Sequence, residues 1–148
     1  VPALFQLNMP GFEGQHYKLV LCLVIIIGLG DVLQFAFGKA FGRRKIAPTV
    51  SPNKTWAGLF GGLAGAALLG WCFTPVTPFR GWQSALLAVV VTAIGFLGGL
   101  TMSAIKRDRG VKDFGTILPG HGGIIDRIDS LSFAAPLFFH LVRYFFTV

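Results

Sequence analysis

Four apolar runs divide the chain, and short polar stretches join them. The runs cover roughly positions 17–37, 56–73, 82–104 and 131–148. Each is close to the length of about 20 apolar residues that a helix needs to cross a bilayer core of about 30 Å. A helix can satisfy its backbone hydrogen bonds internally within a bilayer. The pattern therefore predicts an all-α membrane protein, a bundle of about four transmembrane helices with catalytic loops on the cytoplasmic side.

The composition supports a membrane protein. Hydrophobic residues make up 53% of the chain and charged residues only 13%, with a mean hydropathy of +0.69. A soluble domain has a larger charged fraction and a lower hydropathy. Residues 1–148 are accordingly expected to form a single transmembrane domain.

Basic residues predict how the helices are oriented. The first connection carries Lys39, Arg43, Arg44, Lys45 and Lys54, and the third carries Lys106, Arg107, Arg109, Lys112 and Arg127. The second connection, positions 74–81, has only Arg80. Loops rich in lysine and arginine stay in the cytoplasm. We expect an integral protein of the cell inner membrane with its active site facing the cytoplasm. Because the cations follow apolar runs, nucleic acid is not an expected partner.

Small residues repeat within two of the predicted helices. Gly58, Gly61, Gly62 and Gly65 lie in the second run, and Gly95 and Gly99 in the third. Small residues at a spacing of about four let membrane helices approach closely. These faces predict tight packing within the bundle and are also compatible with a homodimer.

The third connection holds the residues best suited to phosphate chemistry. Of the nineteen Lys, Arg, Asp and Glu residues in the chain, nine fall between Ser103 and Ser130. Asp126 and Asp129 share a face if their segment is helical, close enough to bind a divalent ion. The alternative is an acidic turn that caps the last helix. The cations and the glycine-flanked His121 nearby favour a site for phosphates and metal.

Other candidates lie on the same predicted side of the membrane. Ser103 is one helical turn before Lys106 and Arg107, which can face one site or simply anchor the helix end. Pro52 and Asn53 predict a turn before the second helix, and Thr55 is a candidate N-cap. Ser51 and Lys54 flank that turn and can reach a phosphate. Asp31 is a carboxylate inside the first run, where a polar cavity or a partner is expected.

Two motifs resemble a known family. The pattern S-x-I-K-R-x4-K-D-x-G-x2-L-P-x-H-G-G-I-x-D-R-I-D, from Ser103 to Asp129, looks like the signature of the CTP:phosphatidate cytidylyltransferases, or CDP-diacylglycerol synthases. The stretch SPNKTWAGLFGG, from Ser51 to Gly62, resembles their second hallmark, S-P-x-K-T-x-E-G. The resemblance covers the whole chain but only the C-terminal, catalytic part of a usual family member.

The resemblance implies an activity and its residues. The phosphate of phosphatidic acid attacks the α-phosphorus of CTP, giving CDP-diacylglycerol and pyrophosphate, with Mg²⁺ or another divalent metal required. Asp126 and Asp129 would hold the metal, and Lys106 and Lys112 would join them as catalytic residues. The residues implied to bind CTP or the lipid phosphate are Ser51, Lys54, Ser103, Arg107, His121 and Arg127. The implied partners are CTP, phosphatidic acid or a related lipid phosphate, and membrane lipids.

Three positions depart from the family pattern. Gly99 stands where the family commonly has a metal-binding Asp, and Ala57 where a Glu usually follows S-P-x-K-T. Asp31 is followed by Val-Leu-Gln34-Phe, where two small residues and Ala-Tyr are usual. These departures leave two alternatives open: a paralogue acting on another lipid phosphate, or a catalytically silent membrane subunit that binds nucleotide or lipid.

Overall fold

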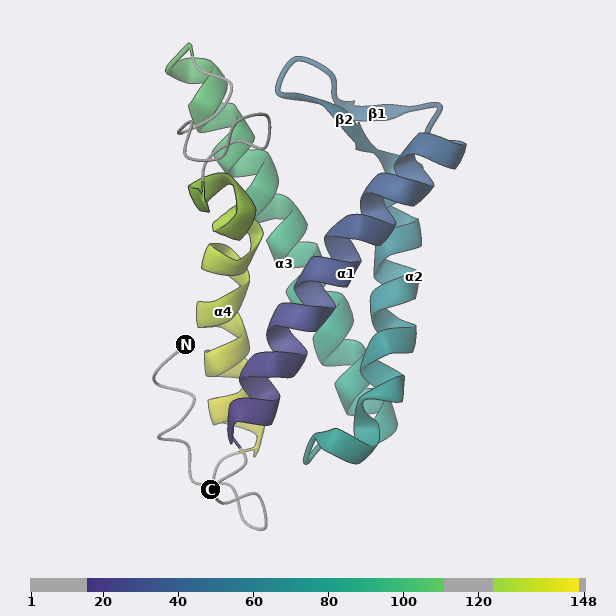
Figure 1. Ribbon diagram of the computed structural model, residues 1–148, viewed down its shortest axis with the longest axis vertical. Coiled ribbons are helices and arrows are strands. Elements are labelled where there is room, and N and C mark those ends of the chain that lie inside the picture. Colours follow the sequence, from purple (N-terminus) through teal and green to yellow (C-terminus); the bar gives the residue numbers. More distant parts are fainter. Residues whose placement is uncertain (1–15, 111–123, 147–148) are drawn as a thin grey trace.

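The computed structural model describes the backbone of residues 16–110 and 124–146, and the side chains of residues 17–110 and 129–145. Four helices form a bundle (Figure 1): α1 (His16–Phe41), α2 (Trp56–Cys72), α3 (Gly81–Asp108) and α4 (Ile124–Phe146). A 3₁₀ turn, η2 (Thr74–Val76), precedes α3. α1 packs against α2, α2 against α3, and α3 against α4. The predicted helical bundle is confirmed over this part of the chain.

Within the described residues, two helices are long and apolar enough to cross a membrane. They are α1, over Tyr17–Phe41, and α3, over Gly81–Asp108, whereas the apolar α2 is shorter, with 17 residues. Large apolar side chains such as Leu21, Leu68 and Leu97 are exposed on the outside of the bundle. Helices that are apolar all round suit a lipid environment. The transmembrane roles of α2 and α4 stay predictions.

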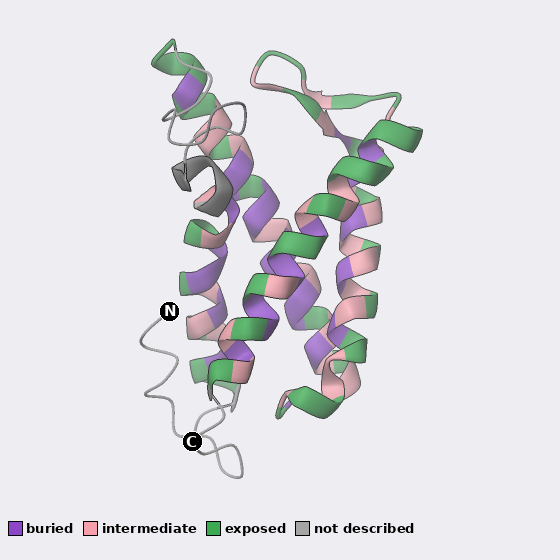
Figure 2. Cartoon of the chain, in the orientation of Figure 1, coloured by how far each residue is buried: buried purple, intermediate pink, exposed green. Residues whose placement is uncertain are grey.

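The centre of the bundle is formed mainly by α1, α3 and α4. Leu19 and Leu23 of α1, Val91 of α3, and Ala134 and Val142 of α4 are almost fully buried in one cluster. In Figure 2 the buried positions face the neighbouring helices, while exposed positions face outward. This packing fixes the relative heights of the three helices and hence of the polar residues they carry.

Glycines hold α2 against α1. A Cβ atom added at Gly62 would collide with the side chain of Gln34, and one added at Gly65 with that of Leu33. At Gly58 the obstacle is the backbone carbonyl of Gln34. Close approach of this kind requires glycine. The predicted small-residue packing face of the second helix is therefore confirmed.

A β-hairpin joins α1 and α2, which the all-α prediction did not include. Strands β1 (Lys45–Ala47) and β2 (Ser51–Thr55) are antiparallel, with Lys45 opposite Thr55. The turn lies at positions 48–50, so the turn predicted at Pro52 and Asn53 is wrong. Both residues are in β2, where a two-stranded hairpin tolerates proline because each strand has an unpaired edge.

The predicted cap of the second helix is confirmed. Thr55 has an extended backbone, with φ −126° and ψ 157°, and its hydroxyl accepts a hydrogen bond of 3.1 Å from Gly58 N. This geometry ends β2 and begins α2 at one residue. It thereby sets the position of Lys54, the residue immediately before the cap.

Candidate active site

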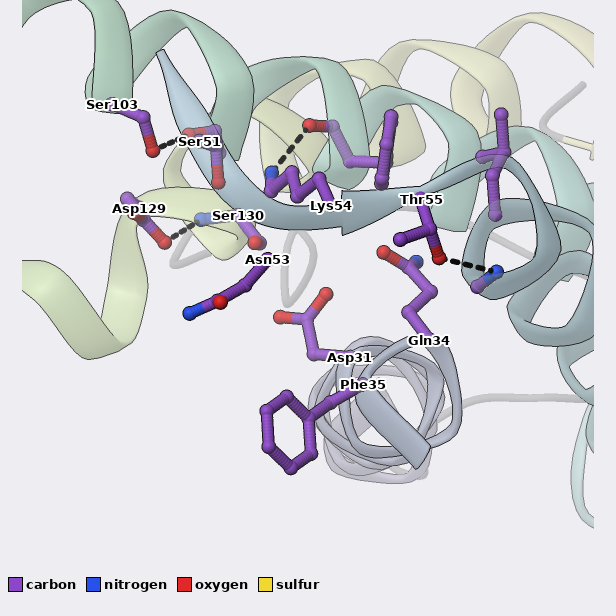
Figure 3. Close-up of a pocket in the computed structure, with 14 residues that line it drawn as sticks. Asp31, Gln34, Phe35, Ser51, Asn53, Lys54, Thr55, Ser103, Asp129 and Ser130 are labelled. Carbon is purple, nitrogen blue, oxygen red and sulfur yellow. Dashed lines mark hydrogen bonds between the residues drawn. The ribbon is translucent and has the colours of Figure 1, made fainter. Parts of the chain in front are cut away.

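A cavity of about 240 Å³ lies where the hairpin meets α1, α3 and α4. Four residues predicted from the sequence to form the site, Ser51, Lys54, Ser103 and Asp129, line it together with Asp31 (Figure 3). These five residues come from four separate elements, β2, α1, α3 and α4. The tertiary structure therefore gathers two carboxylates, one ammonium group and two hydroxyls around one space.

The carboxylate of Asp31 is on the α1 side of the cavity. It is half-buried, and the side chain of Ser130 hydrogen-bonds to it. Lys54 and Asp129 both interact with it electrostatically. The expectation that this intramembrane carboxylate faces a polar cavity is confirmed.

Asp129 is on the opposite side, in the first part of α4. Its Oδ1 accepts a hydrogen bond of 2.7 Å from Ser130 N, which leaves the other oxygen available for a ligand. Since α4 begins at Ile124, Asp126 and Asp129 are within one helical segment, three residues apart. They therefore share a face of the helix, as the spacing predicted, and neither is its N-cap.

Lys54 reaches from β2 to α3. Its Nζ donates a hydrogen bond of 3.0 Å to Phe96 O and lies 4.6 Å from the centre of the Phe96 ring. Burial lowers the pKa of Lys54, the charges of Asp31 and Asp129 oppose this effect, and Lys106 adds to it. The ammonium group of Lys54 shares the cavity with both carboxylates and supplies a positive charge with which an anionic ligand can pair.

The two serines differ in how firmly they are held. Ser103 donates a hydrogen bond of 2.8 Å to Gly99 O, one turn earlier in α3. Ser51 is at the first position of β2, opposite Ala47. Both hydroxyls line the cavity and retain lone pairs, and a hydroxyl can rotate to donate to a phosphate oxygen.

Lys106 and Arg107 do not line this cavity. Lys106 is only 8% exposed, and its charge acts on Lys54. The exposed Arg107 donates from Nε to Val50 O at 3.4 Å, a long contact between α3 and the hairpin turn. The predicted roles of these two cations in catalysis and substrate binding are not tested by this geometry.

Other predicted site residues fall outside the described part of the chain. Lys112 and His121 lie between α3 and α4, in residues 111–123. Asp126 and Arg127 belong to α4, but their side chains are outside the described residues. Their assignments stay predictions.

The structure adds cavity residues that sequence reasoning missed. They are Gln34, Phe35, Asn53, Phe96 and Ser130. Gln34 and Phe35 follow Asp31 by about one helical turn, and Ser130 directly follows Asp129, so helical spacing from the two carboxylates was a usable signal. Phe96 carried no such signal, because its carbonyl matters only through contact with Lys54. The Nε2 atom of Gln34 is buried and has no hydrogen-bond partner among the described residues.

Comparison with known proteins identifies the family. The Cytidylyltransferase family matches residues 1–145. The chain belongs to this family. It is 43% identical to the phosphatidate cytidylyltransferase of Haemophilus influenzae over 157 aligned positions, covering 100% of this chain and 54% of the relative. It is 42% identical to the Pseudomonas aeruginosa phosphatidate cytidylyltransferase, covering 81% of this chain and 45% of the relative.

A further relative is a protein whose name states no function. The Escherichia coli K12 protein named uncharacterized protein YnbB is 48% identical, covering 85% of this chain and 43% of the relative. The chain thus spans about half the length of the curated relatives it matches. The similarity to this protein agrees with the resemblance to a divergent paralogue.

Two positions that depart from the family pattern differ in their location. Gly99 lines the cavity, beside Lys54 and Ser130. Ala57 is half-buried near the start of α2 and does not line the cavity. Of these two departures, only the one at Gly99 lies in the cavity.

The oxygen donors of the cavity fit a magnesium ion. Among the described residues no group of three or more Asp, Glu, His or Cys side chains could hold a metal. Mg²⁺ does not require such a group, because it is commonly bound by one or two carboxylates together with water and substrate phosphates. Asp129 is such a carboxylate in the cavity, and Asp126, the other predicted metal ligand, is three residues earlier in the same helix.

Proposed function

We propose that this protein transfers a cytidylyl group from CTP to phosphatidic acid, releasing pyrophosphate and forming CDP-diacylglycerol. The observation that carries the proposal is the cavity that Lys54, Asp31 and Asp129 line together in a chain of this family. An enzyme joining a charged nucleotide to a lipid needs such a site at the end of a membrane bundle. The end of the bundle that carries the hairpin and its basic residues contains such a site.

The reaction requires little acid–base chemistry. A phosphate monoester has a second pKa near 6, so phosphatidic acid is largely dianionic at neutral pH and already nucleophilic. A phosphate oxygen attacks the α-phosphorus of CTP, and the bond to the bridging oxygen of pyrophosphate breaks. Positioning and charge neutralisation then account for most of the acceleration.

Residues of the cavity have distinct roles in this proposal. Lys54 binds a phosphate oxygen, and Ser51 and Ser103 donate hydrogen bonds that orient it. Asp129, together with Asp126, would hold Mg²⁺, which supplies positive charge to the phosphates when bound. The remaining implied phosphate ligands are Lys106, Arg107, Lys112, His121 and Arg127.

The proposal includes a membrane topology. The four helices span the bacterial inner membrane, with the hairpin and the connection between α3 and α4 in the cytoplasm, where CTP is available. Membrane lipids surround the bundle, and its small-residue faces are compatible with a homodimer. Phosphatidic acid then reaches the cavity from the cytoplasmic leaflet.

A second candidate is a paralogue with another lipid phosphate as acceptor, or a silent subunit that binds nucleotide or lipid. Gly99 favours this candidate, because it leaves the cavity without a carboxylate that the family usually carries there. The two proposals differ in turnover with phosphatidic acid.

The deciding experiment follows radiolabelled CTP with the full-length protein in detergent, phosphatidic acid and Mg²⁺. Formation of a CDP-lipid that disappears in Asp126→Asn supports phosphatidate cytidylyltransferase activity and its metal site. CTP binding without product indicates another acceptor or a silent subunit. Absence of CTP binding contradicts cytidylyl transfer to any acceptor and leaves only a silent subunit that binds lipid.

A further inference from the structure

Gly99 faces the ammonium group of Lys54 directly. A Cβ atom added at Gly99 would lie 2.6 Å from Lys54 Nζ and 3.5 Å from Ser130 Oγ. The first distance is shorter than a carbon and an ammonium nitrogen tolerate without one of them moving. Lys54 can therefore occupy its observed place only if position 99 carries no side chain.

Other groups of α3 also surround the ammonium group of Lys54. Phe96 is three residues before Gly99 and hence on the same face of the helix. Its carbonyl accepts the hydrogen bond from Lys54 Nζ at 3.0 Å, and its ring lies 4.6 Å from that nitrogen. We call this set, Phe96 O, the Phe96 ring and the bare backbone at Gly99, the lysine seat.

The neighbouring glycines of α3 make different contacts. A Cβ atom at Gly98 would collide with Phe133 at 2.6 Å, so that glycine serves the packing of α4. A Cβ atom at Gly95 would meet Ser130 Cβ at 3.5 Å, which is ordinary van der Waals contact. Among these three glycines of α3, Gly99 alone has a charged group of the cavity against it.

We propose that Gly99 is a positioning residue: its missing side chain completes the lysine seat, which holds the ammonium group of Lys54 in the cavity that it shares with Asp31 and Asp129, ready for a substrate phosphate. The phosphate as ligand rests on the proposed function, whereas the placement of Lys54 does not. An L-residue at position 99 moves the ammonium group out of the seat.

The matched pair Gly99→Ala and Gly95→Ala tests the proposal in the full-length protein. Both changes add one methyl group to the same helix, one turn apart, and both raise helix propensity equally. Only the change at Gly99 meets Lys54. Any difference between the two variants therefore comes from the contact with Lys54 and not from a change in helix propensity.

The first readout is independent of activity. Lys54 is labelled in detergent with an amine-reactive reagent, and its labelling rate is followed by mass spectrometry over a range of pH. The limiting rate at high pH, where the amine is neutral, depends on access alone. We expect this rate to rise at least severalfold in Gly99→Ala and to stay at the wild-type value in Gly95→Ala. Equal limiting rates in all three proteins would overturn the proposal.

The second readout is turnover in a double-mutant cycle with Lys54→Met. We expect kcat/KM for CTP to fall roughly tenfold in Gly99→Ala, the effect of losing one hydrogen bond to a charged group. In the Lys54→Met background the same change should have no further effect, because Gly99 acts only through Lys54. A full additional loss in that background would show that Gly99 acts by another route.

The two readouts separate this proposal from the proposed function. If Gly99→Ala exposes Lys54 but the wild-type protein forms no CDP-lipid, the seat is established and the cytidylyltransferase proposal fails. If Gly99→Ala fails to fold, the test uses the wild-type protein alone. The limiting labelling rate of Lys54 is then expected to be well below that of the exposed Lys45. Equal rates at these two lysines would contradict the seat.

Discussion

The ammonium group of Lys54 and the carboxylates of Asp31 and Asp129 meet in one cavity although they belong to β2, α1 and α4. At the scale of single residues, function depends on keeping these charges in balance. Lys54 partly neutralises the two carboxylates, and the carboxylates in turn stabilise its charged form. A substitution at any one of the three changes the charge that a phosphate or a metal encounters.

Replacing Asp129 by Asn tests the metal assignment. The amide keeps the size of the side chain and can still accept the hydrogen bond from Ser130 N, but it lacks the negative charge that Mg²⁺ requires. We expect kcat to fall by at least about a hundredfold, as is usual when the charge stabilisation of a transition state is lost. The thermal midpoint in detergent should change by only a few degrees. Wild-type turnover in Asp129→Asn would refute the assignment.

Lys54 should also give the protein a characteristic pH dependence. Burial lowers the pKa of Lys54, with Asp31 and Asp129 opposing this effect and Lys106 adding to it. Between this lowered pKa and the ordinary lysine value of about 10.4, the unfolded chain binds more protons than the folded one. Stability contributed by this residue therefore rises with pH across that window.

The measurement compares thermal midpoints of the wild type and Lys54→Met over that alkaline range. We expect the wild type to gain stability relative to the variant as pH rises towards the ordinary lysine value. Lys45→Met, at an exposed lysine on β1, is the control and should show no such relative gain. If the thermal midpoints of the wild type and Lys54→Met changed in parallel with pH, the pKa of Lys54 would not be lowered by folding.

At the scale of elements, the contact between α1 and α2 and the hairpin that links them position the site. Glycines of α2 bring its backbone close to α1, and the Thr55 cap fixes where β2 ends and α2 begins. Lys54 is thus held from one side by the cap and from the other by α3. Any change that separates α1 from α2 also moves Asp31 away from Lys54.

Gly58→Ala tests this close contact. A methyl group there would collide with the backbone carbonyl of Gln34 and lie 3.2 Å from Gly38 Cα, neither of which can swing aside. We expect a loss of about 1–3 kcal/mol in the free energy of unfolding, as for an overpacked core. This loss exceeds the gain of about 1 kcal/mol in helix propensity.

The control for Gly58→Ala is Gly28→Ala in α1. Nothing lies within 4 Å of a Cβ atom at this exposed position, so only the gain in helix propensity remains. Thermal unfolding in detergent should show a lower midpoint for Gly58→Ala and an unchanged or higher one for Gly28→Ala. Similar midpoints for the two variants would show that α1 and α2 are not tightly packed.

At the scale of the whole molecule, the bundle has two different ends. The β-hairpin is at one end, and the connection between α2 and α3 is at the other (Figure 1). The exposed Arg43, Arg44 and Lys45 are at the start of the hairpin, whose strand β2 lines the cavity, and Arg80 directly precedes α3. The distribution of cations predicts that the hairpin end is cytoplasmic. This orientation would place the cavity on the side of the membrane that contains CTP.

Single cysteines introduced at the two ends test the orientation in a Cys72→Ser background, which removes the exposed native cysteine. A membrane-impermeant maleimide should label Arg80→Cys in intact spheroplasts and Lys45→Cys only in inside-out vesicles. The buried Cys22 should be labelled in neither preparation. Labelling of Lys45→Cys in intact spheroplasts would reverse the topology.

Much of this architecture could be predicted from the sequence, because its signals are local. Apolar runs gave the four helices to within a few residues, except that α4 begins about seven residues earlier than its apolar run. Polar residues such as Asp126 and Asp129 form that first part, and hydropathy alone does not detect a polar helical segment. The hairpin was missed for a related reason: proline and asparagine favour turns, while pairing with β1 places them in a strand.

By itself, the sequence determined the helical bundle, the small-residue face of α2, the Thr55 cap and four of the residues around the cavity. These features depend on periodicity, propensity and motif, all of which are properties of short segments. The tertiary structure alone decided that Asp31, Asp129 and Lys54 share one cavity, that Arg107 contacts the hairpin turn, and that Gly99 makes room for an ammonium group. Such contacts join segments far apart in the chain, and their distances depend on how closely the helices pack, which no local pattern encodes.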